Sequence, residues 1–392
     1  MDFGKLAGPQ GQQGIILITV LLILFLLVAV GLGSIVSVHN DYRVTSNIRS
    51  ATAALYLAES GIEWTKEQIA AATNLPLELA DRTLALRTGD FNVSVLTSIQ
   101  PSPLRGQLVV RSTGNASNAA QTVQARITKR YDLADAALVF RGAARGFRLL
   151  AASFLSDGRD HDLITLAVLT DSPARFGATA GSVELFDLIN GALDETRANT
   201  FASKNIGRRA IAQTDWLPRE LVSELADGIC SAGAARITAI PASGTLAIKD
   251  QSWGTRNSPE IRCIEGTSDA TDSINIMGNT SGAGILVLRN LEMIVSGSFG
   301  WDGLIVITGR DVGLRITGLD RKEITGAIVI NETGAALGSG PTLFDVQGNL
   351  RILFSRQSLD LSATLIPPAV LKRGFPKLPF TLHQDYWRTI SP

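Results

Sequence analysis

The sequence predicts an α+β fold, in which a long apolar N-terminal helix is followed by a small antiparallel sheet and a larger, β-rich C-terminal unit. Three observations support this prediction. No charged residue occurs from Ile15 to Val38, segments of alternating polarity follow between Gly89 and Tyr131, and near-identical glycine-containing segments recur in the second half of the chain. Alternating polarity is typical of half-buried strands, and repetition at a regular spacing is typical of stacked structural repeats.

The composition sets limits on the number of folded units and on the partners. At 392 residues the chain is longer than one hydrophobic core usually serves, so we expect two or more units. Lysine plus arginine and aspartate plus glutamate number 36 each, which leaves no basic field and argues against a nucleic-acid partner. Aromatic residues make up only 6%, so aliphatic side chains must fill the cores.

The charge-free segment is predicted to cross a membrane once. As a helix it would be roughly 36 Å long, which exceeds the bilayer core of about 30 Å. The alternative is a cleaved secretory signal peptide, with Gly31, Gly33 and Ser34 resembling a cleavage site. Signal peptides usually have a shorter apolar region of about 7–15 residues. The flanking charges do not determine the orientation of the span.

The helix is predicted to continue well beyond the span. Apolar residues repeat every seven positions and form a narrow stripe suited to packing on another helix or sheet, at Ile48, Leu55, Ile62 and Ile69. Proline restricts the residue before it, so we expect the helix to stop at the sequence Asn74-Leu75-Pro76. Strands are predicted at 91–96, 107–111 and 122–127, with a turn at 112–117.

The C-terminal unit contains repeats. The segments 284–288, 303–307 and 326–330 are near copies, and shorter apolar segments lie between them at 293–297 and 314–318. Repeats of about 20 residues with glycine at the corners predict a solenoid-like β-helix over residues 272–354. An irregular antiparallel sandwich is the alternative. A further strand is predicted at 163–169 and a short helix at 215–225.

Cys230 and Cys263 are the only cysteines of the chain and have no metal-ligand spacing. In an oxidising compartment they predict one disulfide, whereas two buried free thiols are the alternative.

No pattern of catalytic or cofactor-binding residues is present. The three histidines are far apart in sequence, and no HExxH, GxSxG, P-loop or GxGxxG motif occurs. We therefore expect no enzyme activity, no cofactor and no metal site. Asp157, Asp160 and Asp162 could offer oxygen ligands to calcium, but a solvated turn is the favoured interpretation.

Two segments near the N-terminus carry a resemblance to a known family. Gly14 precedes the apolar helix that begins at Ile15, and the helix later contains Ala58-Glu59-Ser60-Gly61. This combination, from about Gly11 to Lys66, resembles prepilins and the PilX-type pilus assembly proteins. The resemblance implies cleavage after Gly14 by a prepilin peptidase, and methylation of Ile15 as the new N-terminus.

One position departs from the usual pattern of that family. Most major pilins carry glutamate at the fifth mature residue, where it neutralises the N-terminal amine of a neighbouring subunit. Here that residue is Thr19. Because a lone carboxylate in lipid is costly, its absence eases membrane residence and removes a contact that sets the register. The resemblance then implies a minor pilin at the tip, or one that initiates assembly.

The expected organisation has four parts: a prepilin leader, a membrane-spanning helix, a small pilin-like sheet and a glycine-rich β domain, at residues 1–14, 15–75, 76–134 and 135–392. The expected function is that of a structural subunit of a type IV pilus or type II secretion pseudopilus. Its partners would be the inner membrane, other pilins or pseudopilins, and the peptidase. The C-terminal domain would be periplasmic, then displayed at the cell surface. The alternative is a membrane-tethered β-solenoid adhesin for a host or surface ligand, or a polysaccharide-active protein.

Overall fold

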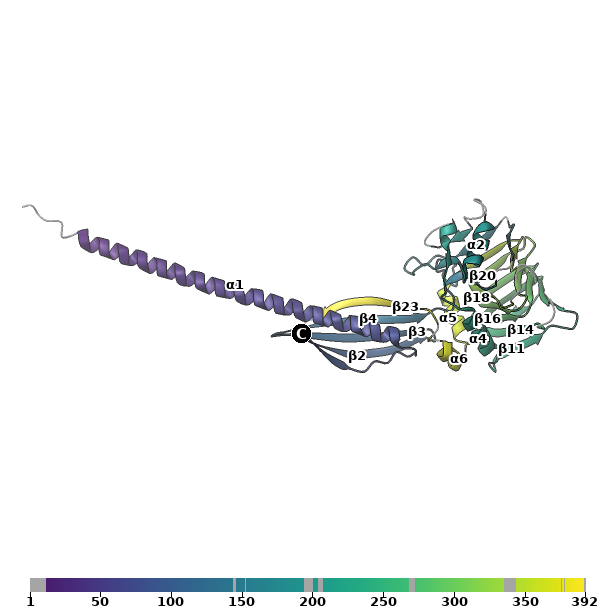
Figure 1. The fold of residues 1–392 in the computed structure, drawn as a ribbon, viewed down its shortest axis with the longest axis horizontal. Helices are drawn as coiled ribbons and strands as arrows, with labels where there is room; N and C mark the ends of the chain where they lie inside the picture. The colour runs from purple at the N-terminus through teal and green to yellow at the C-terminus, as the bar shows by residue number, and fades with distance from the viewer. Residues whose placement is uncertain are drawn as a thin grey trace, which may run out of the picture.

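The computed structural model describes residues 12–143, 146–151, 153–193, 200–203, 207–267, 272–334, 343–374, 376 and 378–390. The molecule is elongated, with helix α1 projecting from one end, an antiparallel sheet around the C-terminal part of α1, and a β-rich unit beyond it (Figure 1). Helix α1 spans Gln12–Ala71, 60 residues, which corresponds to about 90 Å. The predicted long helix is confirmed, and it ends just before the predicted stop.

The N-terminal unit consists of the last part of α1 and a five-stranded antiparallel sheet. The strand order is β1-β2-β3-β4-β23, formed by Arg82–Leu86, Gly89–Ser102, Arg105–Ala116, Ala119–Tyr131 and Phe380–Ile390. Helix α1 packs across one face of this sheet (Figure 1). Three of the four residues of the predicted stripe take part: Ile62 and Ile69 are 2% exposed and Leu55 packs half-buried beside them, whereas Ile48 is 61% exposed.

The predicted hairpin is present, but its turn lies at Ser117 and Asn118 and does not extend over 112–116. Strand β3 continues to Ala116, and its pairing with β4 runs without interruption to Ala116 opposite Ala119. The hydroxyl groups of Thr113 and Thr122 form a hydrogen bond across the pair at 3.0 Å. The small and polar residues that suggested a turn therefore belong to a strand, because small residues are needed where α1 crosses the sheet.

The C-terminal segment returns to this sheet. The sequence groups residues 380–390 with the glycine-rich β domain, but in the structure they form β23, which pairs antiparallel with β4 from Phe380 opposite Tyr131 to Ile390 opposite Thr122. The chain thus leaves the sheet at the end of β4 and re-enters it beside the same residue.

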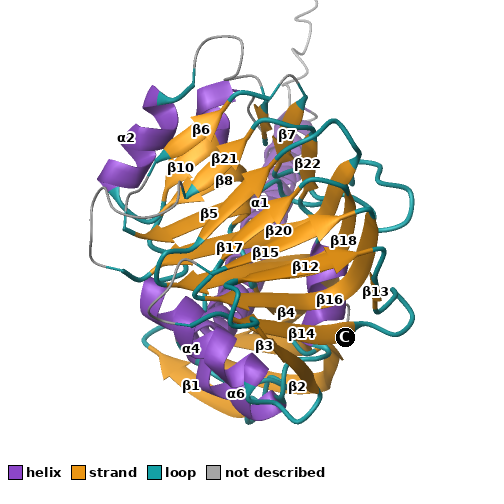
Figure 2. Cartoon of the chain, turned by 90° about the vertical axis from the view of Figure 1, so that its right-hand side faces the viewer, coloured by secondary structure: helices purple, strands orange, loops and turns teal. Residues whose placement is uncertain are grey.

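The C-terminal unit is built on two parallel sheets (Figure 2). The larger contains β10, β8, β5, β20, β18, β16, β14 and β11 in that order, at Ile211–Gln213, Phe176–Ala180, Ala136–Gly142, Lys322–Glu332, Ser298–Gly309, Asn279–Arg289, Glu260–Glu265 and Ala235–Ala239. It also includes β13, β22, β7 and β9, at Ser252–Trp253, Leu350–Leu353, Phe154–Asp157 and Phe201–Ala202. The smaller contains β12, β15, β17, β19, β21 and β6, at Thr245–Lys249, Ser273–Met277, Glu292–Val295, Gly313–Ile316, Phe344–Val346 and Phe147–Leu149.

Successive strands alternate between the two sheets from β14 to β22, and every pairing within them among the described residues is parallel. The antiparallel alternative is therefore wrong. The three near copies lie in register, with Gly284 opposite Gly303 and Gly303 opposite Gly326. A Cβ at Gly303 would lie 1.9 Å from the carbonyl oxygen of Gly284, and φ there is +145°, so only glycine fits.

Short helices cover the parallel sheets. They are α2, α4, α5 and α6, at Val183–Gly191, Arg219–Cys230, Arg356–Ala363 and Pro368–Gly374, with a 3₁₀ turn, η1, at Gly207–Ala210. The helix predicted at 215–225 is thus present as α4, with Pro218 at its N-cap. The strand predicted at 163–169 is wrong: Asp162 accepts hydrogen bonds from the amides of Ile164 and Thr165 and fixes a turn there.

Candidate functional site

The first half of α1 projects away from the rest of the described structure, and every residue from Leu17 to Arg49 is exposed. It contains an 18-residue window with a mean hydropathy of 2.8, none of which is buried, and it is the one described helix long and apolar enough to cross a membrane. Phe25 is 74% exposed and Val38, the predicted end of the span, is 67% exposed. Thr19 is also exposed. Gly14 and Ile15 lie at the start of α1, and their side chains fall outside the described part of the structure.

The predicted motif lies where α1 crosses the sheet. Ala58 and Gly61 are buried against the strands, whereas Glu59 is half-buried and Ser60 is exposed. The hydroxyl of Ser60 donates to the carbonyl of Tyr56 at 2.8 Å. The two small residues of the motif thus form the contact face, and its two polar residues point away from the sheet or along its margin.

The approach of helix and sheet is very close. A Cβ at Gly114 of β3 would lie 2.1 Å from the carbonyl oxygen of Ala54 and 2.4 Å from the amide nitrogen of Ala58. A Cβ at Gly61 would lie 2.1 Å from the hydroxyl oxygen of Ser112. Real side chains do not tolerate such distances, so a glycine on each element lets the two backbones touch.

A lysine from the sheet closes the C-terminus of α1. Lys129 of β4 is 1% exposed, and its ammonium group donates to the carbonyls of Ile69, Ala70 and Ala72 at 2.9, 3.0 and 2.5 Å. The last carbonyls of a helix lack the usual intrahelical donors, and a cation at this end also favours the helix dipole. The carbonyl of Ile69 also accepts from the amide of Ala72 at 3.2 Å, and the carbonyl of Ala72 from the hydroxyl of Tyr131 at 3.1 Å. Its ammonium also lies 4.1 Å from the centroid of the Phe380 ring, on β23. Burial lowers the pKa of Lys129 to about 8.

Replacing Lys129 by methionine is expected to destabilise the last turns of α1 by about 1–3 kcal/mol, because three carbonyls at the helix end lose the hydrogen bond from the ammonium group. The difference from wild type should widen with pH. Between the folded pKa of about 8 and the ordinary value of about 10.4, the unfolded chain binds more protons, so the stability that Lys129 contributes rises across this window. Hydrogen exchange of residues 62–72 at pH 7, 8.5 and 10 measures this effect.

Lys66→Met is the matched control. Lys66 lies on α1, the helix that Lys129 caps, but it forms a partly exposed ion pair with Glu63 at 2.6 Å. Such pairs contribute little. Equal protection in K129M and K66M at every pH would contradict the capping role.

The next residue of β4, Arg130, binds the C-terminal unit. Arg130 donates to both carboxylate oxygens of Asp360 in α5 at 3.0 Å each, and to the carbonyl of Arg356 at 3.2 Å. Burial raises the pKa of Asp360, and the Arg130 guanidinium opposes that shift. Since side chains alternate along a strand, Lys129 and Arg130 bind opposite partners, the helix and the C-terminal unit.

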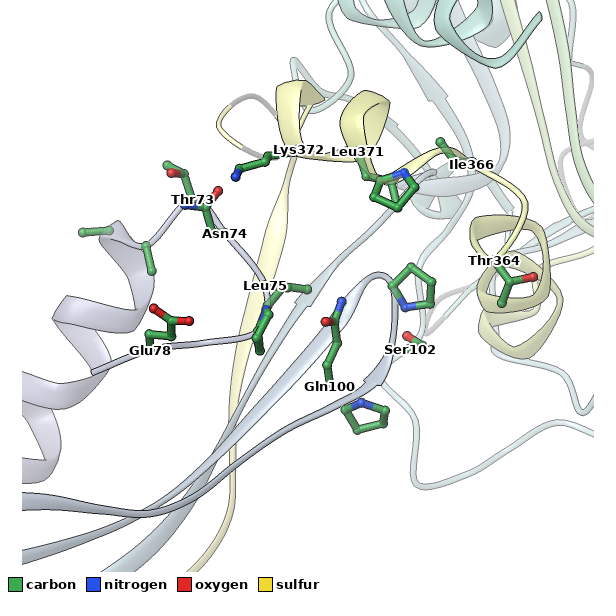
Figure 3. Close-up of a pocket in the computed structure, with 16 residues that line it drawn as sticks. Thr73, Asn74, Leu75, Glu78, Gln100, Ser102, Thr364, Ile366, Leu371 and Lys372 are labelled. Carbon is green, nitrogen blue, oxygen red and sulfur yellow. The ribbon is translucent and has the colours of Figure 1, made fainter. Parts of the chain in front are cut away.

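A cavity of about 1070 Å³ opens beside this contact. It lies between the loop that follows α1, the β2–β3 turn and the segment around α5 and α6, and Figure 3 shows polar side chains from each, including Asn74, Gln100 and Lys372. Apolar contacts also join the two units, because Leu104 and Tyr131 belong to the same buried cluster as the core of the parallel-sheet unit and Leu75 packs against it.

Of the three aspartates that were candidates for calcium, Asp162 lies in an exposed turn, whereas Asp157 and Asp160 do not. Asp157 and Asp160 are 1% and 4% exposed. Asp157 accepts from the guanidinium of Arg159, and Asp160 accepts from the backbone amide of Arg356 at 2.8 Å and from its side chain at 3.2 Å. The expected solvated turn is wrong for these two residues, because Asp157 forms a buried ion pair with Arg159 and Asp160 forms one with Arg356. No group of three or more metal-ligating side chains occurs among the residues described.

Cys230 at the end of α4 and Cys263 in β14 form a disulfide, with their Cα atoms 5.9 Å apart. The predicted pairing is therefore present, and it ties a covering helix to the larger parallel sheet.

Sequence reasoning missed Gly114, Lys129 and Arg130. Gly114 was assigned to a turn, although a glycine in the middle of an otherwise alternating segment can also mark close backbone approach. Lys129 had a weak sequence signal for burial, because it is a charged residue between Ile127 and Tyr131 on the inward-facing side of a strand.

Among the comparisons with known proteins, one family model matches the N-terminal part of the chain. Residues 13–63 match the family described as PilX N-terminal. No curated protein matches the sequence. A solved structure, the competence-associated pilin ComZ from Thermus thermophilus, aligns at 13% identity over 87% of this chain and 97% of its own, with a TM-score of 0.27, which is too low to establish a common fold. The matched residues cover the exposed apolar half of α1 and the Ala58–Gly61 contact, and over this N-terminal segment the chain is similar to PilX-type, pilin-like proteins.

Proposed function

We propose that the chain is a minor structural subunit of a type IV pilus or type II secretion pseudopilus, placed at the tip or in the initiating complex. The observation that carries the proposal is the exposed apolar half of α1, which continues as the helix that packs on the antiparallel sheet and lies within the segment that matches the PilX N-terminal family. Before assembly this half would cross the inner membrane with the C-terminal unit in the periplasm. After assembly it would pack among the helices of other pilins or pseudopilins.

The tip position is supported by Thr19. A subunit within the shaft needs a group that neutralises the N-terminal amine of its neighbour, and threonine carries no charge to do so. A bulky C-terminal unit at the far end of the molecule from α1 is also easiest to place at a filament end (Figure 1). We infer that this unit, in which strands alternate between two parallel sheets, is a β-solenoid displayed outward.

Processing is tested by the mass of the mature N-terminus. When the full chain is expressed with a prepilin peptidase, we expect a protein that starts at Ile15 and carries one methyl group. Gly14→Val should retain Met1, whereas Gly8→Val in the same leader should be cleaved normally. An intact Met1 in the wild type, or a start near Ser34, would refute the processing claim.

Position is tested separately by immunogold labelling of filaments with an antibody against the C-terminal unit. Label at one end is expected. Label along the shaft would exclude the tip role and leave the pilin-like assignment intact.

A further inference from the structure

The outer face of the larger parallel sheet carries a hollow of about 400 Å³ over β16, β18 and β20. Its walls are polar: they include Ser281, Asp302, Arg321 and Glu323 from the strands and their ends, and Arg256 from the loop before β14. This hollow is separate from the contacts of the N-terminal unit described above.

The hollow exists because a glycine interrupts a row of side chains. Ser281, Gly300 and Glu323 are neighbours across the three strands, so they lie on the same face. A Cβ built at Gly300 would meet only the Cβ of Ser281, at 3.9 Å. The space above Gly300 is therefore open, with a hydroxyl on one side and a carboxylate on the other.

The charged groups of the hollow are already paired with one another. Arg256 donates to Asp302 at 2.6 and 3.3 Å, Arg321 donates to Glu323 at 2.7 Å, and Arg351 donates to the other oxygen of Glu323 at 3.0 Å. The three arginines are balanced by Asp302, Glu323 and Asp162, whose charge also acts on Arg256, so the hollow has no net attraction for a polyanion or a polycation. The side chains of Asp302 and Arg256 remain 20% and 40% exposed, which leaves donors and acceptors open to a ligand.

The floor beneath the hollow is rigid. Trp301 is 1% exposed, its ring stacks on Phe299 with centroids 6.4 Å apart, and it meets Trp253 edge-on at 6.5 Å. Trp253 and Trp301 are thus packing residues, not exposed stacking platforms. A rigid floor holds the polar groups of the opposite face in place, and this preorganisation lowers the entropic cost of binding.

We propose that this hollow binds a neutral oligosaccharide. Sugar hydroxyls donate and accept hydrogen bonds at once, which suits ion-paired arginines and carboxylates beside serine and asparagine side chains, and a neutral sugar needs no net charge in its site. An extended peptide fits less well, because strand β18 is paired on both edges and offers no free backbone groups. Binding here does not require filament assembly, so it stands apart from the proposed function.

The test uses the full chain in nanodiscs, which avoids detergents with sugar headgroups. The probes are maltopentaose, cellopentaose and chitopentaose, with tetragalacturonate and a Gly-Ser decapeptide for comparison. We expect saturable binding of at least one neutral pentasaccharide. Gly300→Trp should weaken that binding at least about tenfold by filling the hollow. Gly191→Trp is the control, since a Cβ there also meets nothing within 4 Å, in α2 and far from the hollow.

Arg256→Gln provides a second variant that removes one wall without adding bulk, and it should also weaken binding. No binding of any of the three neutral sugars would overturn the proposal. So would preferential binding of the acidic sugar or of the peptide, or unchanged binding in both hollow variants. None of these outcomes bears on the N-terminal processing test.

Discussion

Replacing Gly114 by valine is expected to destabilise the N-terminal unit by about 3 kcal/mol, because the new side chain has no room between β3 and α1. Its Cβ alone would lie 2.1 Å from the carbonyl oxygen of Ala54, and neither that oxygen nor the amide of Ala58 can move without displacing the helix backbone. Urea unfolding of the purified chain in nanodiscs, followed by hydrogen exchange in α1 and β3, measures the loss.

Gly33→Val is the control for this substitution, since a Cβ at Gly33 meets nothing within 4 Å in the protomer. We expect its unfolding midpoint to match that of the wild type. If G114V and G33V unfolded at the same urea concentration, the backbone contact between helix and sheet would not be the stabilising feature that the distances indicate.

Removing the disulfide is expected to destabilise the C-terminal unit by about 3–4 kcal/mol, because the bond closes a loop in the unfolded chain. The two cysteines are 33 residues apart and are 3% and 0% exposed. The double variant C230A/C263A should therefore unfold the parallel sheets at lower urea concentration. Hydrogen exchange in β14 and α4 reports that change.

The N-terminal unit serves as the internal control in the same experiment. Protection of α1 and β3 should be unchanged, because the disulfide lies in the other unit. A loss of less than about 1 kcal/mol, or an equal loss in both units, would argue against a local loop-closure effect.

The sequence was most informative where the pattern is local. Three features could be predicted because each depends on spacing along one segment. They are the uncharged span, the buried residues Ile62 and Ile69, and the in-register copies around Gly284, Gly303 and Gly326. Parallel, in-register pairing of these copies agrees with the predicted stacking of repeats, whereas the antiparallel alternative does not.

What could not be predicted depends on partners distant in sequence. Asp160 looked solvated because its partner, Arg356, is 196 residues away. Lys129 looked like an ordinary strand lysine, since its acceptors lie about 60 residues earlier at the end of α1. The return of residues 380–390 had no local signal, because a strand that alternates in polarity fits the edge of either unit.

The return of β23 has a mechanical consequence. The C-terminal unit is attached to the sheet at two neighbouring points: β4 ends at Tyr131, β23 begins opposite it at Phe380, and the amide of Asp132 donates to the carbonyl of Pro379 at 3.0 Å. Tension applied along α1 and the antiparallel sheet would pass beside these two points rather than between them. We therefore expect that force applied along α1 and the antiparallel sheet is not transmitted through the parallel-sheet unit. The parallel-sheet unit should then keep its shape when the N-terminal unit is under tension.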